Sequence, residues 1–157
     1  MAMFNLPLAE DKTHIIRFSR SIVKDKSHFD FLGFEFRWGK SRIGKIILKR
    51  RTSPKKLRKA IANFASWCKE NRNLRITILF SKINRKLRGY YSYYGLVGNS
   101  KALWSFFYGA KIKLLKWLNR RSQKKSYNWQ AFNDLMKDLN MAKPRIIRRP
   151  TQFRLGF

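Results

Sequence analysis

The chain has 157 residues, and its 37 Lys and Arg against 8 Asp and Glu give a formal net charge of +29 at pH 7. Hydrophobic residues make up 44% of the sequence and aromatic residues 15%, which is enough for the core of one moderate domain or two small subdomains; because cations and aromatics interleave along the whole length, a simple basic tail is excluded. A compact protein with this charge repels itself, so we expect a polyanionic partner, with nucleic acid favoured over an anionic membrane surface.

The first predicted elements are short extended segments. His14 to Phe18 is predicted to be extended, and the aromatic-rich stretch from Phe29 to Arg37 is predicted to be a strand. Residues 38–44 form a predicted turn and residues 45–51 a returning strand, so we expect a small β-hairpin. Its open strand edges would be an aggregation hazard or an attachment site for another part of the protein.

From Pro54 onward the hydrophobic period becomes helical. Ser53 is a good N-cap for the first helix, Asn99 or Ser100 caps the third, and Gly95 is a natural stop for the second. The predicted helices cover residues 54–71, 76–94, 100–121 and 129–139.

The change of period places a boundary between Thr52 and Pro54. We expect an α+β fold that is mostly α. Residues 1–52 form the β-hairpin segment, residues 53–142 a bundle of three to four helices, and residues 143–157 a basic extended tail.

The second predicted helix divides its tyrosines between two faces. Tyr93 lies about 100° from the centre of the apolar stripe, on the side of Lys82, Lys86 and Gly89. A glycine inside a helix costs about 1 kcal/mol relative to Ala, but it lets another backbone come close, which is either a neighbouring helix or a ribose-phosphate strand. The other three tyrosines are expected in the core: Tyr90, Tyr91 and Tyr94.

The third predicted helix has a wide apolar arc. Trp104, Tyr108 and Ile112 extend the arc beyond the main core face, so the helix is expected to pack on two sides. A charged strip opposite the arc is normally a solvated face, but with so few acids in the chain we interpret it as contacting phosphates. This strip consists of Gly109, Lys113, Lys116 and Arg120.

The sequence supplies few groups for catalysis. No two acids form a recognisable metal-binding pair, and His14 and His28 lack the spacing of metal ligands. Cys68 lies on a core stripe, and as the single cysteine it excludes a disulfide framework and fits a reducing compartment. No Gly-rich phosphate loop is present. By itself the chain is therefore predicted to bind, with no catalytic residue, no metal site and no cofactor.

No targeting or membrane segment is expected. Residues 1–11 lack the basic start and long apolar run of a signal peptide. No stretch approaches the ~20 apolar residues of a membrane helix. We therefore expect a cytoplasmic protein without a membrane partner.

Several blocks of the sequence resemble one known family. FDFLGFEFR (residues 29–37), INRKLRGYYSYYG (83–95) and WLNRRSQKKSYNWQAFNDLM (117–136), followed by KPRI, resemble the C-terminal part of bacterial group II intron-encoded proteins. These are reverse transcriptases that also act as maturases. The similarity covers about residues 6–147, and the second and third blocks are specific signals of the maturase-specific domain, also called domain X or the thumb.

The resemblance implies a palm remnant in the β-hairpin and a thumb-like bundle after it. In the family the FLGF segment lies beside the growing primer end, so a primer-grip-like role is implied for Phe31, Leu32, Gly33 and Phe34. The catalytic aspartates of the family would lie upstream of Met1, and no endonuclease module follows. Polymerase activity is therefore not implied for this chain, and Mg²⁺ would act only through bound RNA or a missing palm domain.

What the resemblance does imply is RNA binding, by basic helix faces. The expected partner is structured, group II intron-like RNA, and further candidates are an RNA/DNA duplex and a separate N-terminal reverse-transcriptase fragment. The residues expected to contact nucleic acid are Lys55, Lys56, Arg58, Lys59, Lys82, Arg85, Lys86, Arg88, Gly89, Tyr93, Lys113, Lys116, Arg120 and Arg121.

Three interpretations stay open. The chain is a maturase-type RNA-binding domain, without polymerase activity by itself, that stabilises a folded intron-like RNA for splicing or retrotransposition. Alternatively, it is the C-terminal half of a split RNA-directed DNA polymerase whose fingers and palm aspartates lie on a separate chain. A decayed remnant with a fold but no role is the third.

Overall fold

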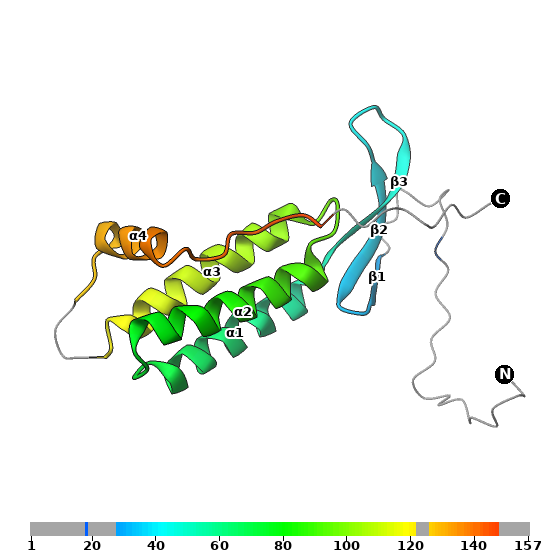
Figure 1. The fold of residues 1–157 in the computed structure, drawn as a ribbon. Helices are drawn as coiled ribbons and strands as arrows, with labels where there is room; N and C mark the ends of the chain where they lie inside the picture. The colour runs from blue at the N-terminus through cyan, green and yellow to red at the C-terminus, as the bar shows by residue number, and fades with distance from the viewer. Residues whose placement is uncertain (1–17, 19–27, 122–125, 148–157) are drawn as a thin grey trace, which may run out of the picture.

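A computed structural model describes the protein at Phe18 and over residues 28–121 and 126–147. A small antiparallel sheet stands at one end of a bundle of long helices (Figure 1), which confirms the expected α+β, mostly α fold. No helix in the described part is both long and apolar enough to cross a membrane. The elements are β1 (His28–Phe31), β2 (Phe34–Lys40), β3 (Ile46–Thr52), α1 (Pro54–Asn71), α2 (Ile76–Tyr94), α3 (Ser100–Leu118) and α4 (Trp129–Asp138).

The sheet has the strand order β1-β2-β3, with one turn more than the sequence predicted. The single strand predicted over residues 29–37 is wrong, because a tight turn at Leu32 and Gly33 divides it into β1 and β2. Both turn residues have positive φ, 48° and 82°, as in the type I′ turn that joins antiparallel strands. A bulky residue such as Leu32 is uncommon at positive φ, and the turn was therefore not predicted. The returning strand predicted over residues 45–51 is confirmed as β3.

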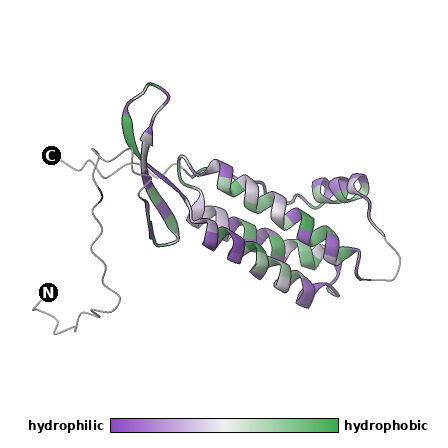
Figure 2. Cartoon of the chain, turned by 180° about the vertical axis from the view of Figure 1, so that it is seen from behind, coloured by the Kyte–Doolittle hydropathy of each residue, from purple (hydrophilic) through white to green (hydrophobic). Residues whose placement is uncertain are grey.

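The helices bury the stripes that their periodicity predicted, and Figure 2 shows the alternation of hydrophobic and hydrophilic residues along them. The bounds of α1 and α2 agree with the predicted ranges, whereas α3 ends earlier, at Leu118. Phe64 and Cys68 of α1 pack with Tyr91 of α2 in one core, as expected.

The last described segment, residues 139–147, returns along the helices toward the sheet (Figure 1). The backbone N–H of Ala142 donates to Oδ1 of Asn84 on α2 at 2.7 Å. Gly95 ends α2 as predicted, and it must be small for a further reason: a Cβ there would lie 2.9 Å from the carbonyl oxygen of Arg145. The segment is therefore part of the packed structure of the bundle.

Some of the predicted segments fall outside the described residues. Of the extended segment His14 to Phe18, only Phe18 is described, and its ring lies 4.8 Å from that of Phe29. Residues 148–157 of the predicted tail also lie outside. The division into domains at Thr52 to Pro54 stays a prediction.

The sheet and the bundle meet at a buried asparagine. Oδ1 of Asn99 accepts a hydrogen bond from the backbone N–H of Thr52 at 2.8 Å, and its Nδ2 donates to Oγ1 of Thr52 and to the carbonyl oxygen of Tyr94, both at 2.8 Å. Asn99 occupies the N-cap position of α3, but its side chain makes no capping bond because these partners use it. Ser53 behaves similarly before α1: its hydroxyl donates to Oδ2 of Asp30 at 2.6 Å.

We predict that Asn99→Ala lowers the free energy of unfolding by about 3 kcal/mol. The backbone N–H and the hydroxyl of Thr52, which are both buried, lose their hydrogen bonds at about 1–3 kcal/mol each. Urea denaturation followed by circular dichroism measures the change. Asn63→Ala, at an exposed position of α1, is the matched control and should shift stability by no more than about 0.5 kcal/mol. Equal effects of the two substitutions would contradict the role of Asn99.

Candidate nucleic-acid interface

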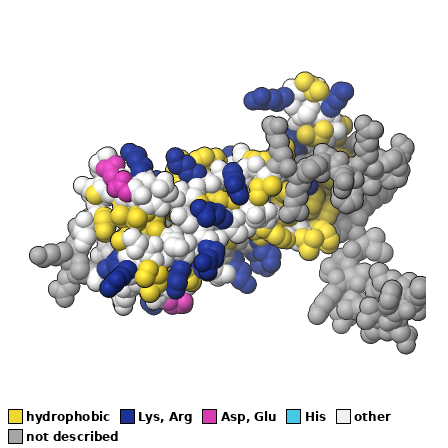
Figure 3. Space-filling view, viewed as in Figure 1, with side chains coloured by type: hydrophobic (Ala, Val, Ile, Leu, Met, Phe, Trp, Pro, Cys, Tyr) yellow, Lys and Arg dark blue, Asp and Glu magenta, His cyan; other side chains and the backbone are white. Residues whose placement is uncertain are grey.

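Unpaired positive charge covers much of the bundle surface. In Figure 3 Lys and Arg side chains are spread over the face in view, and acidic side chains on that face are few. Within residues 28–121 and 126–147 the only ion pairs are Arg51–Glu35 and Lys137–Asp134. None of the predicted nucleic-acid-binding residues belongs to either pair. Such a surface repels itself, and a bound polyanion relieves that repulsion.

The outer face of α2 carries Lys82, Arg85 and Gly89, which are all exposed and lie within about 60° of one another around the helix. A Cβ placed on Gly89 would have no atom of the described chain within 4 Å. Of the two alternatives for what approaches Gly89, a neighbouring helix is therefore not found in the described chain. Close approach of a ribose-phosphate strand stays a prediction.

Lys86 lies where α2 meets α1. Its Nζ lies 4.9 Å from the centre of the Trp67 ring, a cation–π contact that holds the side chain without neutralising its charge. Beside it, burial raises the pKa of Cys68 to about 12 although the charge of Lys86 acts in the opposite direction. The thiol is therefore neutral near pH 7 and is a core group, not a nucleophile. Among the described residues no group of three or more His, Cys, Asp and Glu is placed to hold a metal ion.

Tyr93 contacts the β1–β2 turn, which the sequence did not predict. Its hydroxyl donates to the carbonyl oxygen of Leu32 at 2.8 Å, and its ring stacks on Phe34 with centroids 5.9 Å apart. The ring is still half exposed. Tyr93 thus faces solvent beside the basic residues of α2 and also ties the end of α2 to the β1–β2 turn. Tyr90, Tyr91 and Tyr94 pack against the core, as predicted.

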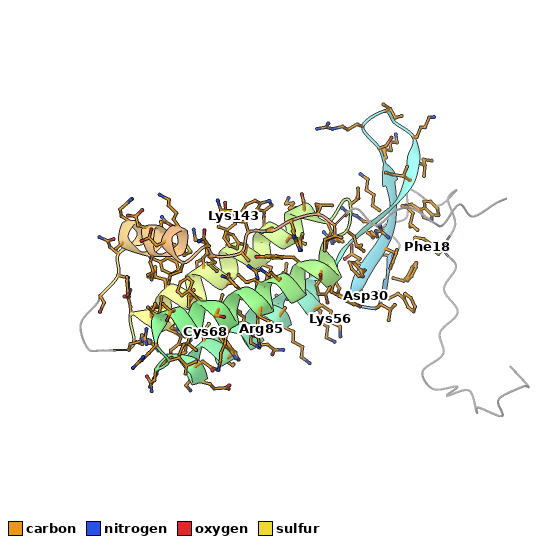
Figure 4. The ribbon with its side chains drawn as sticks, in the orientation of Figure 1. Phe18, Asp30, Lys56, Cys68, Arg85 and Lys143 are labelled. Carbon is orange, nitrogen blue, oxygen red and sulfur yellow. The ribbon has the colours of Figure 1, made fainter. Side chains whose placement is uncertain are left out.

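The four residues of the predicted primer-grip-like segment have different environments. Phe31 and Leu32 are exposed, whereas Phe34 is buried against the end of α2. Gly33 must lack a side chain, since a Cβ would lie 2.8 Å from the hydroxyl oxygen of Tyr94. Next to the turn is an open cavity that Asp30, Lys56 and Tyr93 help to line, and Figure 4 shows Asp30 and Lys56 together at the sheet end of the bundle. Leu32 and Gly33 also line this cavity, whereas the buried Phe34 does not.

The predicted strip on α3 is less open than expected. Gly109 packs against α1, where a Cβ would lie 2.8 Å from Cδ1 of Ile61, so its place in a solvent-facing strip is wrong. Lys113 is partly buried, and Lys116 and Arg120 are exposed near the end of α3.

At the C-terminal end of this strip, three cations cluster around the ring of Trp117. Lys116, Arg120 and Arg72 of the α1 C-cap lie 5.8, 5.3 and 5.9 Å from the centre of the Trp117 ring. Arg121 differs from them, because its guanidinium donates to the carbonyl oxygen of Leu74 between α1 and α2. Arg121 therefore has a structural contact in addition to any role in binding.

The predicted residues extend over more than one side of the bundle. Ile61 faces α3 and Trp67 faces α2, and these positions are about 120° apart around α1. The cations of α2 and those of α3 therefore lie on different sides of α1, whose own exposed Lys55, Lys56, Arg58 and Lys59 lie between them. Arg88 lies about 60° further around α2 than Arg85, and it lines a cavity together with Asn84.

Sequence reasoning missed one group of side chains altogether. Trp104, Tyr108 and Ile112 are exposed, so the expectation that this arc of α3 packs on both sides is wrong for the described part of the chain. Lys111 lies in the middle of the same arc and is partly buried. Lys111 inside an apolar arc was the sequence signal that could have identified this group.

Comparison with known proteins gives one match. The model of the family described as group II intron, maturase-specific domain, matches residues 55–135, which is more than half of the chain and covers α1, α2, α3 and most of α4. Searches of curated proteins and of solved structures found no match.

Tyr93→Phe should lower the free energy of unfolding by about 0.5–1.5 kcal/mol, because it removes only the hydrogen bond to the carbonyl of Leu32. Tyr108→Phe is the control, since the structure gives its exposed hydroxyl no such bond. Urea denaturation of both variants checks this expectation. A Tyr93→Phe protein as stable as the control would show that the hydroxyl does not hold the turn.

Proposed function

The chain belongs to the family of group II intron maturase-specific domains, and on this basis we propose that it binds structured, group II intron-like RNA and stabilises its folded form for splicing or retrotransposition. The RNA is the catalyst in this proposal, and the protein contributes binding energy. Polymerase activity is not part of the role of this chain by itself.

The observation that carries the proposal is the outer face of α2. Lys82 and Arg85 are exposed without acidic partners, and Gly89 leaves the helix backbone open between them and Tyr93. Cationic side chains on phosphates release counterions, and an open backbone permits contact with ribose hydroxyls. Contacts of this kind recognise the shape of an RNA more than its sequence.

A second candidate function is the C-terminal half of a split RNA-directed DNA polymerase. It is supported by the sheet: in the described residues β3 pairs only with β2, and its Ile46, Ile47 and Leu48 are exposed. An open, apolar strand edge accepts a strand of another polypeptide. An adjacent reading frame encoding fingers and palm aspartates, with co-purification of the two products, would support this role, and the absence of such a frame would count against it.

We predict that the affinity for a group II intron RNA falls steeply with salt. If about six phosphates are neutralised, the logarithm of the binding constant should decrease against the logarithm of KCl concentration with a slope of about −4 to −5. Filter binding between about 50 and 300 mM KCl measures the slope. An affinity that does not change with salt would contradict phosphate binding.

The double variant Lys82→Ala/Arg85→Ala should reduce this slope by about 1.5–2 and weaken binding at low salt. Lys40→Ala/Lys45→Ala removes the same charge from exposed positions around the β2–β3 turn and is the matched control. A purely non-specific effect of net charge would change both variants equally. The triple variant Lys113→Ala/Lys116→Ala/Arg120→Ala then tests whether the α3 side also contacts the RNA.

Gly89→Ala separates binding from stability. The substitution should raise the free energy of unfolding by about 0.5–1 kcal/mol, because Ala is the better helix former and open space surrounds the position. RNA affinity should nevertheless fall, since the methyl group keeps the RNA backbone away. Ser92→Ala, exposed one turn further along α2, is the control. Unchanged affinity in Gly89→Ala would mean that no RNA backbone approaches Gly89.

A further inference from the structure

Exposed aromatic rings line the side of α3 that faces away from its cationic strip. Trp104 and Tyr108 of α3 and Trp129 of α4 are 40%, 56% and 50% exposed. The rings of Trp104 and Tyr108 are one helical turn apart, with centroids 5.8 Å apart and planes inclined by 33°. Three large aromatic side chains left partly in water at the same place are unusual for a helix packed in a core.

Lys111 lies among these rings. Its Nζ is 5.6 Å from the centre of the Trp129 ring and 5.9 Å from that of Tyr108, and it donates to Oδ1 of Asn133 at 3.1 Å. Partial burial lowers the pKa of its amine. No carboxylate in the described residues pairs with it, and the nearby Asp134 bonds instead to Gln130 and Lys137. A cation held in this way has its best complement in an external anion.

A groove of about 740 Å³ opens beside Lys111, between α3, α4 and the segment of residues 139–147. This volume is in the range of pockets that bind small molecules. Its wall has an aromatic ring, amide side chains and lysines, from Phe107, Lys111, Gln130, Asn133, Lys137 and Lys143. Amides can hydrogen-bond the edges of bases, and lysines can bind phosphates.

We propose that this groove and the rings beside it, which we call the α3–α4 groove, bind unpaired nucleotides of the RNA, separately from the basic face of α2. The charge favours this occupant over a protein, because the groove is lined by three lysines and by no acid, and the neighbouring Asp134 already bonds to Lys137. Flat exposed rings interleaved with cations are how proteins hold single strands, by stacking bases and binding phosphates. The inference rests on the proposed RNA binding and adds the class of RNA structure bound at this second place.

The test compares two fluorescent RNA probes on the full chain: a single-stranded oligouridylate of about ten nucleotides and a fully paired hairpin. Tyr108→Ala and Trp104→Ala should each weaken binding of the oligouridylate about 5- to 150-fold, the range for loss of one base–aromatic stack, with little change for the hairpin. Tyr108→Phe, which keeps the ring, should bind the oligouridylate at least about 3-fold tighter than Tyr108→Ala.

Two controls accompany this comparison. Ile43→Ala removes an exposed apolar side chain from the β2–β3 turn and should leave oligouridylate binding unchanged, and circular dichroism confirms the fold of each variant. Ultraviolet crosslinking of the oligouridylate followed by mass spectrometry should identify peptides that contain Trp104, Tyr108 or Trp129.

The outcomes separate the two proposals. Equal binding of the oligouridylate by wild type and Tyr108→Ala, or crosslinks confined to α2, would overturn the α3–α4 groove and leave the proposed function intact. A wild-type protein that binds the hairpin but not the oligouridylate would also overturn only the proposal for the α3–α4 groove. A wild-type protein that binds neither probe and no intron RNA would overturn both.

Discussion

The arrangement of the sheet and the helices depends on the buried side-chain amide of Asn99. It bonds to Thr52 at the end of β3 and to Tyr94 at the end of α2, while its own backbone begins α3. Displacing any of these elements would leave buried polar groups without partners, which costs about 1–3 kcal/mol for each group. The junction therefore holds the β1–β2 turn at the end of α2, where Tyr93 and Lys56 lie beside it.

Because acids are scarce, many of the cations are held by aromatic rings and not by carboxylates. Lys86 lies over Trp67, a group of cations surrounds Trp117, and Lys111 lies among the rings of α3 and α4. A cation–π contact stabilises a cation by about 0.5–2 kcal/mol and leaves its charge in place. The protein thus positions its cations without neutralising them, and the charge remains for an external polyanion. Paired RNA on the basic face of α2 and unpaired nucleotides in the α3–α4 groove are complementary uses of this charge.

Most of the helical structure could be predicted, and most of the contacts between elements could not. The bounds of α1 and α2 follow from a hydrophobic period that each helix carries in its own sequence. The turn at Leu32 was not predicted, because a bulky residue is uncommon at positive φ, although the apolar positions change phase there, from Phe29 and Phe31 to Phe34 and Phe36. Helical geometry placed Gly109 opposite the apolar arc, but only the packing of α1 shows that Ile61 covers it. Tyr93 was correctly placed off the core stripe, yet its bond to a residue far away in the chain had no local signal.

Composition and periodicity by themselves determined the mostly helical class, the excess of positive charge and the stripes that become the core, because these properties are written within single elements. The resemblance of the sequence blocks further indicated the family. The tertiary structure alone decided that the basic residues of α2 and α3 lie on different sides of α1, that Gly89 is open whereas Gly109 is covered, and that Lys111 meets the exposed rings. The physical reason is that each of these facts depends on which helix packs against which, and that is set by long-range contacts such as those of Asn99 and of residues 139–147, which no local pattern encodes.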